Sequence, residues 1–243
     1  IVDSAFVSNM QGTGEMALNA LTLAFPIQML MVAVSIGTGV GTNALLSRCL
    51  GMGDSKKAAR VGGNAMFLAI IIYVLCLIFG IFGVGVYIGT QTTNSQIYDM
   101  ATDYLRICSV ISIGIVFFSI FEKMLQATGL SLYSTVAQIT GAVINIILDP
   151  IFIFVFHLGV QGAALATIIS QGISCIWVLK FLTGNKTHIK IRIKNLRLSK
   201  QIVFLVISLG ISPFVMQSTD CFIQLVFNNG MLKYGNDSYV ALM

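Results

Sequence analysis

The sequence contains few charged residues. They make up only 9% of its 243 positions, against about 25% in typical soluble domains. Hydrophobic residues make up 56% of the chain, and the mean hydropathy is +0.91. These values exclude a soluble enzyme domain, a disordered tail and a collagen-like fibre. They favour a polytopic membrane protein, and at about 20 residues per spanning helix the length holds roughly six to eight passes.

Cysteine and histidine are also scarce, with five and two residues respectively. No CxxC pair occurs, so the sequence indicates neither a zinc site nor a disulfide framework. His157 and His188 lie near predicted loops without an evident nucleophile. We therefore predict that the protein is not an enzyme, has no catalytic residue and uses no cofactor.

Long apolar runs separated by short polar loops predict an all-α membrane helix bundle. Strands of a membrane barrel would alternate apolar and polar residues over about ten positions, and these runs are unbroken. Asp54 or Ser55 is expected to cap the second long helix. The predicted spans cover residues 16–50, 58–88, 97–127, 131–156, 162–182 and 201–228, with helix ends at residues 1–8 and from Tyr239, and a turn at residues 231–238.

The basic residues indicate the orientation. Of the 14 lysines and arginines, only Arg106 and Lys233 lie beside loops on one side of the predicted bundle. The positive-inside rule places the other side in the cytoplasm. The net charge of +5 therefore reflects topology rather than nucleic-acid binding. The basic segment at residues 184–200 is interpreted as a solvated connector, in preference to a patch for lipid headgroups or nucleic acid.

The two ends of the chain resemble each other weakly. Residues 1–22 and 222–243 share five identical positions without gaps, and both contain a helix end, a polar turn and a helix start. A second half is therefore expected to begin near residue 200, after six helices, and two such lobes with a site between them form a transporter plan. Because the chain begins at Ile1 within an apolar stretch, we expect it to be a piece of a longer protein.

Four acidic residues fall within predicted spans, and no lysine or arginine lies deep in any of them. Ionisable groups within a bilayer are costly, so each is a candidate for function. An acidic interior suits a cation or a proton. The four residues are Asp3, Glu122, Asp149 and Asp220.

Asp149 has the most informative surroundings. Asn145 lies one turn earlier on the same helix face, and Gln138 extends this polar stripe further back. Pro150 removes an amide donor and frees the carbonyl of Ile146, while Thr167 of the next helix can add a hydroxyl. Such hard oxygen ligands suit a small cation. A polar helix-packing seam is the alternative.

Four segments of the sequence resemble the multidrug and toxic compound extrusion (MATE) family. The resemblance covers nearly the whole chain, and its motifs are long, ordered and specific. It implies twelve helices in two six-helix lobes. The segments are ALTLAFPIQMLMVAVSIGTGVGTNALLSRCLGMGDSKKAARVGGNA (20–65), EKMLQATG (122–129), GAVINIILDPIFIF (141–154) and VQGAALATIISQ (160–171).

On this resemblance, residues 1–184 are the amino-terminal lobe with a truncated first helix, residues 185–199 link the lobes, and residues 200–243 begin the second lobe. The family match implies a sodium or proton site formed by the residues Asp3, Asn145, Asp149 and Thr167. The resemblance leaves open whether Glu122, which departs from a neutral residue in some relatives, joins this site, lines the substrate cavity or pairs with Lys123. Gln138 and Asp220 are further candidates for the substrate cavity.

The family implies a cation-coupled antiporter in the plasma membrane that exports drug-like organic cations by alternating access, and we expect it to be monomeric. A flippase for lipid-linked sugars would share the two-lobe plan, but its anionic cargo would require buried arginine or lysine. A membrane assembly protein without transport would need no buried acidic cluster. These two remain the alternative hypotheses.

Overall fold

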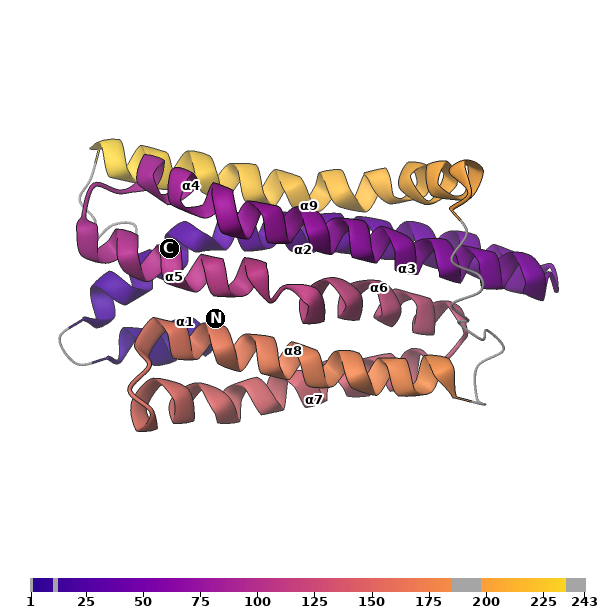
Figure 1. Cartoon of the computed structure of the whole chain (residues 1–243), viewed down its shortest axis with the longest axis horizontal. Coiled ribbons are helices and arrows are strands. Elements are labelled where there is room, and N and C mark those ends of the chain that lie inside the picture. The colour runs from indigo at the N-terminus through magenta and orange to yellow at the C-terminus, as the bar shows by residue number, and fades with distance from the viewer. Residues whose placement is uncertain (1, 11–12, 185–197, 235–243) are drawn as a thin grey trace.

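The computed structural model describes residues 2–10, 13–184 and 198–234, and within these ranges every regular element is helical. Long helices run along one common axis and reverse direction at the loops, so successive loops alternate between two ends of the bundle (Figure 1). The α-helices are α1 (Val2–Ser8), α2 (Gly14–Gly51), α3 (Ser55–Ile78), α4 (Val84–Gln91), α5 (Ser95–Val110), α6 (Ile113–Ala127), α7 (Ser131–Pro150), α8 (Gly159–Thr183) and α9 (Lys200–Tyr234). Two π-helical turns, η1 (Phe79–Gly83) and η2 (Ile151–Val155), continue α3 and α7.

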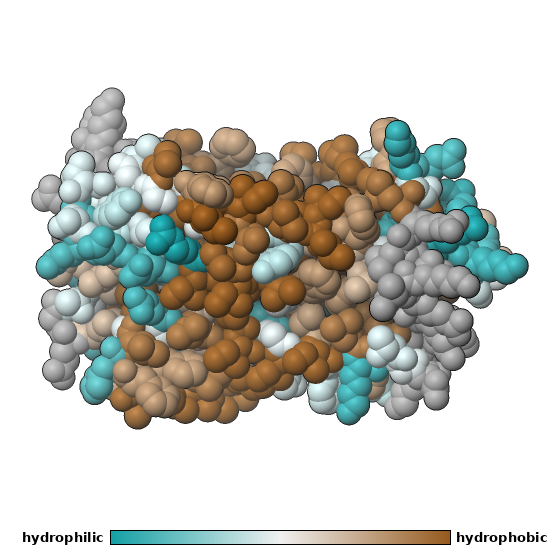
Figure 2. All heavy atoms as spheres, viewed as in Figure 1, coloured by the Kyte–Doolittle hydropathy of each residue, from teal (hydrophilic) through white to brown (hydrophobic). Residues whose placement is uncertain are grey.

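The lengths and composition of these helices confirm the predicted membrane bundle. In the described part of the chain, five continuous helical segments are long and apolar enough to cross a membrane, and α5 with α6 provides a sixth as a bent pair. Figure 2 shows a broad apolar surface between two hydrophilic ends. In lipid such a surface needs no protein partner, because the backbone polar groups are paired within the helices.

Residues 97–127, predicted as one helix, form two helices. The helix is interrupted between α5 and α6, and the axes of these two helices meet at an angle of 48°. Ile111 leaves the helical conformation with φ −101° and ψ 29°, and the hydroxyl of Tyr73 donates a hydrogen bond of 3.4 Å to the carbonyl of Val110 beside the break. A distant helix thus satisfies a backbone group that the break exposes, which local sequence cannot reveal.

Asp54, rather than Ser55, caps α3, because its carboxylate accepts a hydrogen bond of 2.9 Å from the amide of Lys57. The predicted turn at residues 231–238 begins too early, since α9 continues through Tyr234. The rest of that turn and most of the basic connector, including His188, lie outside the described residues.

Pro26 interrupts the hydrogen bonding of α2 about a third of the way along the helix. Proline has no amide hydrogen, so the carbonyl of Thr22 loses its usual helical donor. The side-chain amide of Asn228 on α9 donates to this carbonyl at 3.4 Å. The thiol of Cys221, also on α9, donates to the carbonyl of Pro26 at 3.0 Å. These contacts join α9 to α2.

Three glycines continue the contact between α2 and α9 toward the other end. A Cβ atom added at Gly41 would collide with the carbonyl oxygen of Val206, and one added at Gly210 would collide with that of Gly37. Small residues allow such close backbone approach in membrane bundles. The helix α9 therefore packs directly on α2, whereas the assignment of residues 200–243 to a second lobe stays a prediction.

Candidate cation site and cavity

Helices α1, α7 and α8 bring together the four residues that the sequence singled out for a cation. The hydroxyl of Thr167 donates a hydrogen bond of 2.9 Å to the carboxylate of Asp3. The amide of Asn145 lies 3.4 Å from a carboxylate oxygen of Asp149 and 3.4 Å from the hydroxyl of Thr167. Two carboxylates, an amide and a hydroxyl thus meet at one place, although Asp3 and Thr167 are 164 positions apart in the chain.

Asp149 is the most deeply buried member of this group. Its side chain has no solvent exposure, and its Oδ2 atom has no hydrogen-bond partner among the described residues. Asp3 interacts with it electrostatically, and two ionised carboxylates at one site repel each other. A buried charge without a counter-charge is expensive, so this arrangement favours occupation by a cation or a proton.

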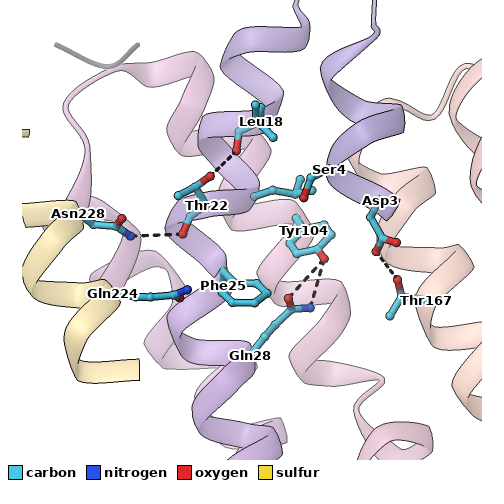
Figure 3. A pocket seen from close by; sticks show the side chains of 11 residues that line it. Asp3, Ser4, Leu18, Thr22, Phe25, Gln28, Tyr104, Thr167, Gln224 and Asn228 are labelled. Carbon is cyan, nitrogen blue, oxygen red and sulfur yellow. Dashed lines mark hydrogen bonds between the residues drawn. The ribbon is translucent and has the colours of Figure 1, made fainter. Parts of the chain in front are cut away.

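Asp3 also faces a cavity of about 520 Å³. Within the cavity wall, the side chains of Gln28 and Tyr104 hydrogen bond to each other at 3.3–3.4 Å. Figure 3 shows this pair between Asp3 and the residues of α9. Aromatic, amide, acidic and apolar groups line the cavity, and no arginine or lysine is among the described lining residues. The lining residues are Asp3, Ser4, Leu18, Leu21, Thr22, Phe25, Gln28, Tyr104, Thr167, Gln224 and Asn228.

Sequence reasoning missed most of the polar cavity wall. Gln28 is an amide in a long apolar span, and Gln224 and Asn228 stand four residues apart on one face of α9. Polar residues at such spacing were the available signal. Tyr104 offered no signal, because its position opposite Gln28 depends on how α5 packs against α2.

Glu122 lies in a separate cluster between α6 and α7. Its Oε1 atom accepts hydrogen bonds from Gln126, from Ser134 at 3.0 Å and from Gln138 at 2.9 Å. Lys123 lies 3.6 Å from the same oxygen. Glu122 therefore pairs with Lys123, which was one of the three alternatives for its role. Neither Glu122 nor Gln138 is among the described residues that line the cavity around Asp3.

Asp220 is exposed on α9 and is not part of the cavity wall either, although Gln224, one turn further on, is. The structure therefore brings together the four predicted cation-site residues and leaves the three cavity candidates elsewhere. Among the residues that the structure describes, no group of three or more His, Cys, Asp or Glu gathers as a transition metal would require.

The family model that matches this chain is MatE, and it matches residues 1–151. The chain belongs to the MatE family. The multidrug export protein MepA of Staphylococcus aureus (strain MSSA476) is 28% identical over 228 residues, and the match covers 90% of this chain but 49% of MepA. MepA of Staphylococcus haemolyticus (strain JCSC1435) is 26% identical over 219 residues, covering 90% of this chain and 48% of that protein. The chain thus spans about half the length of these relatives.

Solved MATE structures have the same fold. An inward-facing multidrug resistance MATE transporter superposes with a TM-score of 0.94 at 26% identity, over 99% of this chain and 54% of that one. The MATE multidrug transporter DinF-BH reaches a TM-score of 0.91 at 29% identity over the same shares. MATE proteins are multi-pass membrane transporters and not enzymes, and this chain matches about half of such a protein.

Proposed function

We propose that the full protein exports drug-like organic cations in exchange for sodium ions or protons, by alternating access across the plasma membrane. The observation that carries the proposal is the buried Asp149 with an unpartnered oxygen, held beside Asn145, Asp3 and Thr167. The multidrug export activity named for the relatives supports the choice of cargo.

The donor groups at this site are consistent with either coupling ion. A proton needs one free carboxylate oxygen, and Asp149 Oδ2 supplies it. Sodium needs several hard oxygens, which the carboxylates of Asp3 and Asp149 and the hydroxyl of Thr167 supply. A half-turn of the Asn145 amide would add its oxygen, since amide oxygen and nitrogen differ little in shape.

Asp3 connects the ion to the cargo, because it belongs to the ion cluster and to the cavity wall. An ion bound at the cluster neutralises its charge and changes the position of the first helix, which weakens the hold on a cationic cargo. A ligand shifts a conformational equilibrium only through its different affinities for the two states. The two carboxylates provide that difference.

The cavity chemistry disfavours the flippase hypothesis. A lipid-linked sugar carries an anionic pyrophosphate, whereas Asp3 is the one charged side chain among the described residues that line the cavity. An organic cation with aromatic rings fits this wall better, because Phe25 and Tyr104 can face its rings and Asp3 its charge.

The test is Asp149→Asn in the full-length transporter, reconstituted in proteoliposomes with ethidium as cargo. With a sodium or proton gradient imposed separately, we expect gradient-driven transport to fall by about tenfold or more, within the usual range of coupling between sites. Asp103→Asn is the matched control, because Asp103 accepts a hydrogen bond from Gln161 of α8 and belongs neither to the cation site nor to the cavity wall around Asp3.

If Asp149→Asn loses transport driven by one gradient and keeps transport driven by the other, the ion of the lost gradient is the coupling ion. Transport by Asp149→Asn that keeps the rate and gradient dependence of the unmodified protein would remove Asp149 from the coupling mechanism.

A further inference from the structure

A second cavity, of about 360 Å³, lies at the end of the bundle opposite the α1–α2 loop, where α2, α3 and α9 meet. It is lined by basic and apolar groups, in contrast to the acidic cavity around Asp3. The lining residues are Ala44, Leu45, Arg48, Cys49, Met52, Lys57, Leu205 and Leu209.

The charged side chains in the described wall of this cavity are both positive. Arg48 stands in the last turn of α2 and Lys57 in the first turn of α3, and both side chains are exposed. Among the described residues, no carboxylate lines the cavity and neither cation forms a salt bridge. The nearby Asp54 already accepts the backbone amide of Lys57. Asp54 keeps its charge but lies outside the described wall, so Arg48 and Lys57 are the charged groups that line the described cavity, and an anion complements them.

The remaining wall is apolar and reaches into the membrane span. Leu205 and Leu209 are one turn apart on α9 and are 42% and 46% exposed, beside Leu45 of α2. Arg48 lies one turn from Leu45, and α2 ends at Gly51. The cavity therefore places positive charge at the end of a spanning helix and apolar surface on its membrane side. Figure 2 shows hydrophilic side chains gathered at both ends of the apolar surface.

We propose that this cavity binds an anionic phospholipid, with its phosphate between Arg48 and Lys57 and an acyl chain along Leu205 and Leu209. Basic pockets between spanning helices on the cytoplasmic side suit anionic headgroups. A soluble anion would use the two cations but leave the leucines exposed. The proposal goes beyond the exchange of cations and does not depend on the coupling ion.

The position of the site suggests what such a lipid would do. The cavity is bordered by α2 on one side and α9 on the other, and these helices contact each other closely at Gly41 and Val206. A lipid held by α2, α3 and α9 together stabilises this end of the bundle. Its loss would loosen the contact between α9 and the rest of the described helices.

The experiment measures lipid retention by the purified full-length protein, using native mass spectrometry. Phosphatidylglycerol is compared with phosphatidylcholine of the same acyl chains, and inorganic phosphate is added in a separate arm. We expect phosphatidylglycerol to be retained selectively and its affinity to fall on the order of tenfold in the double variant Arg48→Gln/Lys57→Gln.

The double variant Lys56→Gln/Arg60→Gln is the matched control, because it removes the same amount of charge from the same end of the bundle, at two positions of α3 that are not in the cavity wall. It should retain phosphatidylglycerol like the unmodified protein. Arg48→Lys keeps the charge, so it should bind normally even where the neutral variants fail to accumulate. Ala44→Phe fills the cavity with both cations intact and should also release the lipid.

Equal losses in both double variants would overturn the site, because they indicate surface charge alone. Equal retention of phosphatidylcholine would overturn the headgroup assignment. If inorganic phosphate displaces phosphatidylglycerol completely at equal concentration, the site takes free phosphate and the lipid proposal is wrong.

Discussion

Asp149 and Glu122 are both buried carboxylates on spanning helices, yet their charges meet different surroundings. Glu122 accepts hydrogen bonds from three side chains and lies beside Lys123. Asp149 has one long hydrogen bond and a free oxygen. A saturated carboxylate stabilises the fold, whereas an unsatisfied one is available to an ion. We therefore expect the two residues to respond differently to the same change from acid to amide.

Glu122→Gln should destabilise the protein by about 2 kcal/mol, the usual range for hydrogen bonds to a charged group. The new amide would direct its own hydrogens at donors on Gln126 and Gln138. Thermal unfolding of the detergent-solubilised full-length protein would measure this effect, with the exposed Glu15→Gln as control.

The same Glu122→Gln variant should keep its dependence on the ion gradient in proteoliposomes, per molecule of folded transporter. A variant of unchanged stability that loses gradient dependence would instead place Glu122 in the coupling pathway.

Among the helices, α2 and α9 form the tightest backbone contact, which depends on glycine. In Gly210→Ala, the new methyl group would meet the carbonyl oxygen of Gly37, so backbone atoms must move. Gly172→Ala is the matched control on α8, where a Cβ atom meets nothing within 4 Å. In an unstrained helix, alanine is more favourable than glycine by about 1 kcal/mol.

We therefore expect Gly210→Ala to lower the melting temperature of the full-length protein, and Gly172→Ala to leave it unchanged or raise it. Equal changes in melting temperature for the two substitutions would contradict the close backbone contact between α9 and α2. The comparison removes the general propensity difference, because both variants make the same chemical change.

For the whole molecule, the alternating loops and the basic residues together predict which end is cytoplasmic. Met52 lies in the basic end, between α2 and α3, and Thr93 lies at the opposite end, between α4 and α5; both are exposed. All five cysteines of this chain are buried, so they add little background to thiol labelling.

A membrane-impermeant maleimide should therefore label Thr93→Cys in intact cells, and Met52→Cys only after the cells are opened. Labelling of Met52→Cys from outside would invert the orientation derived from the positive-inside rule. Labelling of both positions in intact cells would contradict the alternating path of the helices.

The sequence alone determined the helical membrane character and nearly all of the spans, because apolar run length is a local property of the chain. Asn145 and Asp149 stand one turn apart on one helix, so their proximity could be derived directly. Thr167 was a candidate from its place on the next predicted helix, whereas the resemblance alone added Asp3 to this site, since no local spacing relates Asp3 to Thr167, 164 positions away.

Only the tertiary structure decided the break between α5 and α6, the Gln28–Tyr104 pair in the cavity wall, and the partners of Glu122. Each depends on which helices lie side by side, and the sequence pattern of a membrane helix says little about this. Lipid is as apolar as leucine, so a helix face that meets lipid and one that meets another helix carry similar residues.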